Sequence, residues 1–255
     1  SGQDGSYLAE YLLKKKYKVI GTTKNIRKLK KWRLERLKID KKITITELNL
    51  NSKKSIDRIF QRYNFNEFYN LAGHSIVTSS FKNSLNTANN TAMGVVRILN
   101  AIKKSKKEIK FYQATTSEIF GDSNKKFQNE NSSYNPKNPY AISKLFAHLM
   151  TKNYRENYNM YAVSGILFNH ESPLRGKEFV TKKIVNGLVN ILNNKKKVLK
   201  VGNLDAKRDW GYAKDYVKVM WKMMQQKKPE DFIISSGKAY SVKYFIDLTL
   251  KYLKI

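Results

Sequence analysis

Apolar residues recur along this chain with two periods, which alternate from segment to segment. Short runs of β-branched and aromatic residues predict strands, and apolar residues spaced three or four apart predict helices. The expected strands are 18–23, 43–48, 67–72, 109–115, 160–168, 198–201 and 231–235. The expected helices are 4–16, 52–63, 85–104, 139–158, 181–193, 213–227 and 241–253. Repeated alternation of the two predicts an α/β fold with a doubly wound parallel sheet.

The first expected helix begins at a glycine-containing turn with no strand before it. The chain opens "SGQDGSYLAEYLL" and continues directly into the helical pattern. In α/β folds such a turn usually follows a strand. We therefore interpret the chain as a fragment whose sheet lacks its first strand.

The expected strand 18–23 ends in a cation rather than an acid. In a dinucleotide-binding fold this strand end meets the adenosine ribose, where an acid binds a free 2′-hydroxyl and a cation suits a 2′-phosphate. Lys24 follows the strand, with Arg27 nearby. These residues favour NADP over NAD, although a surface lysine in a lysine-rich chain would look the same.

Two further segments combine residues suited to proton transfer. Strand alternation would leave Thr116 and Glu118 facing the same way where their strand ends. Tyr140 opens a helix that Asn138 is suited to cap, and Lys144 lies one turn further on. An ammonium and a helix N-terminus would lower the phenol's pKa from its ordinary value of about 10, which would make Tyr140 a usable base.

Composition narrows the possible functions. The chain has 50 Lys and Arg against 20 Asp and Glu, a net charge of +30 that would suit a polyanion. The cations are spread over every segment without a zinc-finger, basic-zipper or RNA-binding signature, so we do not expect nucleic acid to be the main partner. Cysteine is absent, which excludes disulfides and fits a cytoplasmic protein, and no apolar run reaches the roughly 18 residues of a membrane span.

At this point the motifs resemble a known family. The opening turn, Thr116 with Glu118, and Tyr140 with Lys144 are similar to extended short-chain dehydrogenases/reductases that act on nucleotide sugars. "GILFNHESPLRG" at 165–176, "FVTKKI" at 179–184 and "GNLDAKRDWGYAKDYV" at 202–217 are more specific. Together they resemble the GDP-mannose 4,6-dehydratase family over essentially the whole chain.

The resemblance implies a Rossmann-type domain at 1–168, to which 208–240 return. A smaller, incomplete substrate-binding part would comprise 169–207 and 241–255. Family members extend beyond both ends of this chain, which therefore looks truncated, and they assemble as dimers or tetramers.

The resemblance also implies a reaction, the conversion of GDP-mannose to GDP-4-keto-6-deoxymannose on the route to GDP-fucose. Tyr140, tuned by Lys144, would take the 4-hydroxyl proton while hydride passes from C4 to NADP. Glu118 would remove the C5 proton and help water leave from C6, to which the hydride returns. Thr116 would hydrogen-bond the reacting 4-oxygen.

Further site residues are carried over from the family by position, and no metal is implied. The cofactor contacts are Gly2, Gln3, Asp4, Lys24, Asn49, Leu71, Ala72, Gly73, Lys144, His170 and Arg175. The substrate contacts are Asn169, Lys183 and Arg208.

This chain also departs from the family. Leu174 replaces a common second arginine, Asn49 replaces an aspartate, and Lys24 and Asn25 replace an arginine pair.

Two alternatives stay open beside this interpretation. The first is an epimerase or reductase of another nucleotide sugar, which Glu118 disfavours because simple reduction at C4 needs no base for C5. The second is a basic nucleic-acid-binding protein, for which the net charge is the main support.

Overall fold

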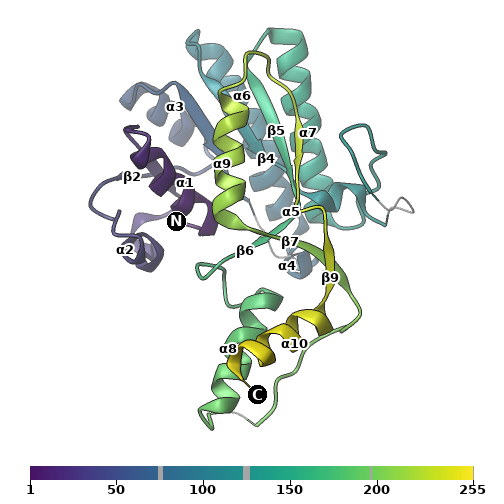
Figure 1. Cartoon of the computed structure of the whole chain (residues 1–255). Coiled ribbons are helices and arrows are strands. Elements are labelled where there is room, and N and C mark those ends of the chain that lie inside the picture. The colour runs from purple at the N-terminus through teal and green to yellow at the C-terminus, as the bar shows by residue number, and fades with distance from the viewer. Residues whose placement is uncertain (74–76, 123–126, 196, 255) are drawn as a thin grey trace.

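The computed structural model describes residues 1–73, 77–122, 127–195 and 197–254 (Figure 1). Its strands are β1 (Ile20–Thr23), β2 (Thr44–Glu47), β3 (Glu67–Asn70), β4 (Lys110–Ala114), β5 (Ala162–Leu167), β6 (Asn169–Glu171), β7 (Lys207–Tyr212), β8 (Phe232–Ile234) and β9 (Ala239–Ser241). Its α-helices are α1 (Gln3–Lys14), α2 (Trp32–Arg36), α3 (Lys53–Arg62), α4 (Val77–Lys82), α5 (Ser84–Thr87), α6 (Gly94–Ser105), α7 (Pro139–Tyr158), α8 (Val180–Leu192), α9 (Ala213–Met224) and α10 (Val242–Leu253). Two 3₁₀ turns, η1 (Ile26–Lys28) and η3 (Ser117–Phe120), and a π-helical segment, η2 (Ala88–Met93), complete the described elements.

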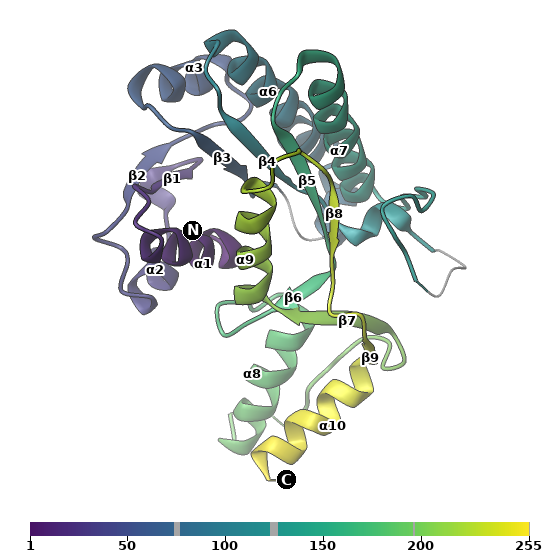
Figure 2. The same ribbon diagram turned by 45° about the horizontal axis from the view of Figure 1, so that its top comes forward.

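The largest sheet has the order β3-β4-β5-β8, and all of its strands are parallel. Helices α3, α6 and α7 cover one face, and α1 and α9 cover the other (Figures 1 and 2). Successive residues of β4 alternate between the two layers, because Phe111 packs with Ile98 of α6 and Tyr112 packs with Met220 of α9. The predicted doubly wound α/β fold is confirmed.

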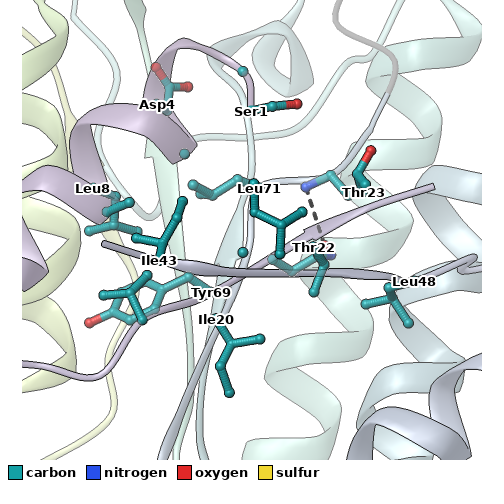
Figure 3. Close-up of a pocket in the computed structure, with 18 of the residues that line it drawn as sticks. Ser1, Asp4, Leu8, Ile20, Thr22, Thr23, Ile43, Leu48, Tyr69 and Leu71 are labelled. Carbon is teal, nitrogen blue, oxygen red and sulfur yellow. Dashed lines mark hydrogen bonds between the residues drawn. The ribbon is translucent and has the colours of Figure 1, made fainter. Parts of the chain in front are cut away.

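Strands β1 and β2 form a separate parallel pair. A cavity of about 1250 Å³ lies between this pair and β3, and Leu8, Ile20, Phe68 and Leu71 are among its apolar lining residues (Figure 3). Within the described residues, β1 pairs only with β2 and β3 only with β4, so one edge of each has no strand beside it. The break occurs where the sequence leads us to expect an absent strand.

A largely buried ion pair, with 15% and 13% of its two side chains exposed, holds the last strand of the main sheet in place. Arg155 near the end of α7 binds both oxygens of Asp231 at 2.8 Å and also donates to the carbonyl of Ala162. Asp231 in turn accepts the backbone N–H of Ser164 in β5 at 2.7 Å. One carboxylate therefore connects α7, β5 and the start of β8.

A smaller lobe lies beyond the carboxyl ends of the main strands (Figure 2). Strand β6 pairs in parallel with β7, and β7 pairs antiparallel with β9. Helices α8 and α10 pack against each other below this sheet. None of the described helices is long and apolar enough to cross a membrane.

One expectation about secondary structure is wrong. Residues 198–201 form no strand, because Leu199 instead covers Gly187 of α8, where an added Cβ would lie 2.5 Å from the leucine side chain. The segment expected as a helix at 85–104 is helical throughout, but 88–93 form the wider π-helical turn η2 between α5 and α6. Arg97 donates to the carbonyl of Asn89 in η2 at 3.2 Å and to the carbonyl of Leu50 at 3.1 Å. The first of these bonds satisfies a backbone oxygen of the π-helical turn.

We predict that Asp231→Ala lowers the free energy of unfolding by about 3 kcal/mol, because it leaves the Arg155 guanidinium buried without its partner. Chemical denaturation monitored by circular dichroism measures this. Asp215→Ala is the matched control, since its pair with Lys218 is exposed, and we expect no measurable loss. Equal stability of the two variants would contradict the role given to Asp231.

Candidate functional site

The first part of the site follows the end of β4. Thr116 caps η3 by accepting the backbone N–H of Glu118 on its hydroxyl at 3.3 Å. The strand ends at Ala114, so the expected strand alternation of Thr116 and Glu118 is wrong. The two side chains come together through the cap of a 3₁₀ turn instead.

Asn138 joins this segment to the start of α7, a contact that the sequence did not predict. Its side-chain oxygen accepts the N–H of Ala141 at 2.8 Å, which confirms the expected helix cap. Its side-chain nitrogen lies 3.4 Å from a carboxylate oxygen of Glu118. Because Tyr140 follows two residues later, the same cap sets the position of the tyrosine relative to Glu118.

Tyr140 and Lys144 lie one turn apart on α7. Lys144 is buried and donates to the carbonyl of Ala114 at 2.7 Å, with its Nζ 5.9 Å from the centre of the Tyr140 ring. Burial raises the pKa of Tyr140 to about 12, against the opposing effect of a hydrogen bond with Thr116. Burial also lowers the pKa of Lys144 to about 8. The pKa of Tyr140 is therefore raised in the protein alone, where we expected it to be lowered, because burial outweighs the hydrogen bond with Thr116 and the charge of Arg175.

Gly73 leaves space beside Lys144. Its φ is +154°, and an added Cβ would lie 3.5 Å from both Lys144 Nζ and Thr91 Oγ1. With Leu71 and Ala72 it lines the cavity between β1 and β3. A backbone without a side chain therefore separates the cavity from the buried ammonium.

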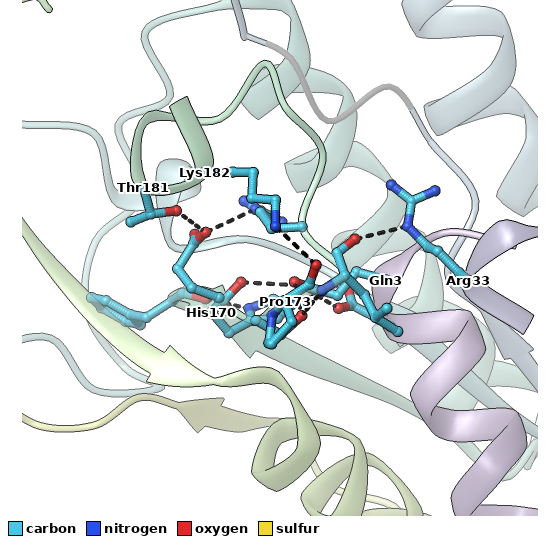
Figure 4. Close-up of polar contacts among 12 residues, drawn as sticks. Gln3, Arg33, His170, Pro173, Thr181 and Lys182 are labelled. Atoms are coloured by element: carbon cyan, nitrogen blue, oxygen red, sulfur yellow. Dashed lines mark hydrogen bonds and ion pairs between the residues drawn. The ribbon is translucent and has the colours of Figure 1, made fainter. Parts of the chain in front are cut away.

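The turn that opens α1 is fixed to β6. His170 Nε2 lies 3.0 Å from a carboxylate oxygen of Asp4, and its Nδ1 lies 2.8 Å from the carbonyl of Phe168 (Figure 4). Burial alone disfavours the imidazolium, yet the Asp4 charge and these bonds raise the pKa of His170 above its ordinary value. The pKa of Asp4 is lowered, because His170 and Gln3 outweigh the opposing effect of its burial.

Gln3 and Ser172 add a second link between the same segments. Gln3 donates to the carbonyl of His170 at 3.0 Å and accepts from the Ser172 hydroxyl at 2.7 Å. The polar side chains of Gln3 and Asp4 are thus engaged within the protein, although we expected them to face a cofactor. No side chain caps the first turn of α1, so the backbone N–H groups of this turn can donate hydrogen bonds to an anion.

Glu171 is another residue that sequence reasoning missed. Its carboxylate accepts a hydrogen bond from Thr181 of α8 and lies 3.2 Å from Arg175 Nε (Figure 4). Burial raises the pKa of Glu171, whereas Arg175 and Thr181 act in the opposite direction. The arginine expected to bind cofactor therefore already has a carboxylate partner.

The cavity brings together many of the expected cofactor residues. Eight of them line it: Gly2, Gln3, Asp4, Lys24, Leu71, Ala72, Gly73 and Arg175. Asn49, Lys144 and His170 do not line it. Asn49 instead accepts the N–H of Asn51 in a local turn, and Lys144 reaches the cavity wall only at Gly73.

The expected substrate residues lie on the smaller lobe. Asn169 begins β6 and Arg208 lies in β7, which pairs with it, while Lys183 is exposed on α8. Arg208 donates to the carbonyl of Lys207 at 2.7 Å. Within the described part of the chain, no group of three or more His, Asp or Glu side chains could hold a metal ion.

We predict that the Asp4–His170 pair stabilises the fold over a limited pH range. Because the pKa of His170 is raised in the folded protein, the pair stabilises the fold fully below the pKa of an unfolded histidine, about 6.5. This contribution is lost as the pH rises through the pKa of His170 in the folded protein. Because the pKa of Asp4 is lowered in the folded protein, the pair stabilises the fold fully above the pKa of an unfolded aspartate, about 4. This contribution is lost as the pH falls through the pKa of Asp4 in the folded protein. Wild type should therefore exceed His170→Gln most between about pH 5 and 6.5. Urea denaturation from pH 5 to 9 tests this, and a pH-independent difference would contradict it.

One family model matches the whole chain. The sequence model described as GDP-mannose 4,6 dehydratase covers residues 1–255. A GDP-mannose 4,6-dehydratase of Vibrio cholerae is 44% identical over all of this chain and 70% of its own length. A GDP-mannose 4,6 dehydratase of Drosophila melanogaster is 42% identical over 99% of this chain and 66% of its own length.

Solved structures share the fold at low sequence identity. A double mutant of dTDP-glucose 4,6-dehydratase from Streptomyces venezuelae, with NAD bound, has a TM-score of 0.86 and 18% identity over 99% of this chain and 79% of its own. Because the family model and these relatives match it over the whole of its own length, this chain belongs to the GDP-mannose 4,6-dehydratase family.

Proposed function

We propose that this chain converts GDP-mannose to GDP-4-keto-6-deoxymannose with a tightly held NADP, a step toward GDP-fucose and related deoxysugars. The observation that carries the proposal is the placement of Glu118, a carboxylate joined through Asn138 to the helix that presents Tyr140 and Lys144. A simple reductase needs the tyrosine and the lysine, whereas removal of a C5 proton needs an additional base.

The turn that opens α1 fits a dinucleotide. No side chain caps this turn, so its backbone amides can donate to a pyrophosphate. Lys24 at the end of β1 supports NADP over NAD, because a cation suits a 2′-phosphate. When bound, the nicotinamide supplies the hydride acceptor for C4 and the hydride donor for C6.

Tyr140 accepts the proton of the sugar 4-hydroxyl in this proposal. With a pKa of about 12 it is a neutral phenol near pH 7, so it needs nearby positive charge to act as a base. Lys144, with a pKa of about 8, still carries its proton at pH 7 and supplies such a charge. Thr116 hydrogen-bonds the 4-oxygen and holds it close to the phenol.

Glu118 acts after the 4-ketone has formed. The ketone makes the C5 proton acidic, and the carboxylate takes this proton and assists the loss of the C6 hydroxyl as water. The bond from Asn138 restricts the carboxylate while leaving its other oxygen for the sugar. One water leaves, and the cofactor returns to its starting oxidation state.

We propose that the smaller lobe binds the GDP-sugar. Asn169, Lys183 and Arg208 are its expected contacts, and the two cations suit a diphosphate. We keep the expected division, with 1–168 and 208–240 for the cofactor and 169–207 and 241–255 for the sugar nucleotide, except at two strands. Strands β7 and β9 belong to the sheet of the smaller lobe, so 208–212 and 239–240 are assigned to that lobe instead. The pairing of β5 with β8 supports the return of the rest of 208–240 to the first domain.

We propose the cytoplasm as the compartment, in keeping with the cysteine-free sequence.

The natural protein that carries this chain, incubated with GDP-mannose and no added reductant, should yield a product lighter by one water. Mass spectrometry measures the loss. Glu118→Gln and Tyr140→Phe should each reduce the rate at least 100-fold, because each removes a proton acceptor.

Glu156→Gln serves as the control for charge, because Glu156 is an exposed residue at the opposite end of α7, and it should retain the wild-type rate. A folded protein with bound NADP that leaves GDP-mannose unchanged would refute the proposal.

We also propose that the chain forms a homodimer through an apolar face on adjacent helices. The face consists of Phe81, Leu85, Met93, Ile142, Phe146 and Leu149, all exposed. Segments α4, α5 and η2 pack beside α7, so these residues belong to neighbouring helices. Residues 83–96 contain no charged side chain, and Lys144 and His148 in the first three turns of α7 are buried.

The charge distribution favours a second copy as the partner on this face. Two molecules that each carry a charge of +30 repel one another except where a surface lacks cations. An acidic partner would instead be drawn to the lysine-rich surfaces. Depletion of charge at an exposed apolar centre is also typical of protein interfaces.

Sedimentation velocity tests the dimer. Phe146→Glu places a charge in the centre of the face and should convert the protein to monomer, because each interface would then bury two like charges. Val198→Glu introduces the same charge at an exposed site away from the face and should leave the dimer intact. A wild type that is monomeric at micromolar concentration would refute the interface.

A further inference from the structure

The face of the main sheet that packs on α6 and α7 changes from apolar to polar near its carboxyl end. Side chains of one face recur at every second residue of a strand. The residues paired across β3, β4 and β5 are first apolar, Phe68, Phe111 and Ala162, and two positions later polar, Asn70, Gln113 and Ser164. All three polar side chains are buried. Because a buried polar group costs free energy unless it is hydrogen-bonded, the contacts of this row indicate its role.

Gln113 binds the same backbone carbonyl as the buried lysine of the site. Its side-chain nitrogen donates to the carbonyl of Ala114 at 2.8 Å, and the ammonium of Lys144 donates to that carbonyl at 2.7 Å. Since Gln113 and Ala114 are consecutive, the amide turns back onto its own strand and fixes the direction of the carbonyl. The acceptor of the ammonium is therefore itself held by a buried side chain.

Asn70 holds Gln113 from the neighbouring strand. Its Nδ2 donates to Gln113 Oε1 at 2.8 Å, and its Oδ1 accepts the backbone N–H of Ala72 at 3.3 Å. Ala72 leads directly to Gly73, where an added Cβ would lie 3.5 Å from Lys144 Nζ. The two amides thus connect the two backbone segments that lie against the ammonium, one after β3 and one at the end of β4.

Packing alone does not call for amides at these positions. Leucine has nearly the shape of asparagine, and methionine that of glutamine, so an apolar pair would fill the same space without any polar atom to satisfy. Such a pair would supply no hydrogen bond to the Ala114 carbonyl or to the Ala72 N–H. The contribution of Asn70 and Gln113 is therefore the orientation of these two backbone groups.

We propose that Gln113 and Asn70 are positioning residues for proton transfer, which hold the backbone around Lys144 and thereby fix its place relative to Tyr140. The inference rests on the proposed function, because it takes Tyr140 and Lys144 to be the proton-transfer pair. Neither amide touches the sugar in this assignment. Displacement of a reacting group by about 1 Å is enough to slow a reaction about 100-fold, so an effect on the rate does not require contact with the substrate.

Steady-state kinetics of the natural protein with GDP-mannose test the assignment. Gln113→Met and Asn70→Leu should each lower kcat at least tenfold and change KM less than threefold, because neither removes a contact to the sugar. A kcat within twofold of wild type in both variants, or a KM that rises as much as kcat falls, would overturn the proposal.

Thr151→Val is the matched control for the loss of a buried hydrogen bond. Thr151 is buried on α7 two turns beyond Lys144 and donates to the carbonyl of Ala147 at 2.8 Å. Its substitution should leave kcat within twofold of wild type. A tenfold loss in this control as well would contradict a role specific to the two amides.

The double variant Asn70→Leu/Gln113→Met separates positioning from stability. Each single variant leaves one buried amide without its partner, whereas the double variant leaves neither, so its midpoint of urea unfolding should return toward that of wild type. Its kcat should nevertheless stay at least tenfold below wild type. Recovery of kcat together with stability would show that the two amides support only the fold, and would overturn the proposal.

Either single variant suffices for the test if the double variant does not fold. A folded wild-type protein that leaves GDP-mannose unchanged would refute the proposed function as well. Wild-type turnover that is unaffected by both single substitutions refutes this inference alone.

Discussion

The hydrogen bond from Lys144 to the carbonyl of Ala114 is the contact on which the arrangement of this site depends. It joins the helix that carries Tyr140 to the last residue of β4, just before Thr116 and Glu118. The ammonium is buried, so losing this acceptor would leave a desolvated charge with no partner, which is costly. The strand end and the helix start are therefore held at a fixed separation, and the Asn138 bond to Glu118 depends on that separation.

Parts of this arrangement could be predicted because they are local. Asn138 and Pro139 mark the start of α7 by capping and by the geometry of proline, and the helix begins where they indicate. The alternation of strands and helices gave the parallel sheet for the same reason, since periodicity reflects which faces are buried. Thr116 and Glu118 were correctly singled out as neighbours, although through the wrong local geometry.

Other features depend on contacts between distant segments, which no local pattern encodes. Gln3 and Ser172 are 169 positions apart, and only the folded chain shows that they share a hydrogen bond. The pKa of Tyr140 was expected to be low because the sequence shows a nearby lysine but not the burial that opposes it. Arg33 resembled any other cation in a lysine-rich chain until the structure placed it against Leu174.

The contacts of Asp231 have a consequence for how the main sheet opens. Its carboxylate binds Arg155 of α7 and the backbone N–H of Ser164 in β5, and it directly precedes β8. Separation of β8 from β5 therefore also breaks the contact with α7. Elements linked in this way open together as one cooperative unit, so the amide hydrogens of β5 and β8 should exchange with solvent at similar rates.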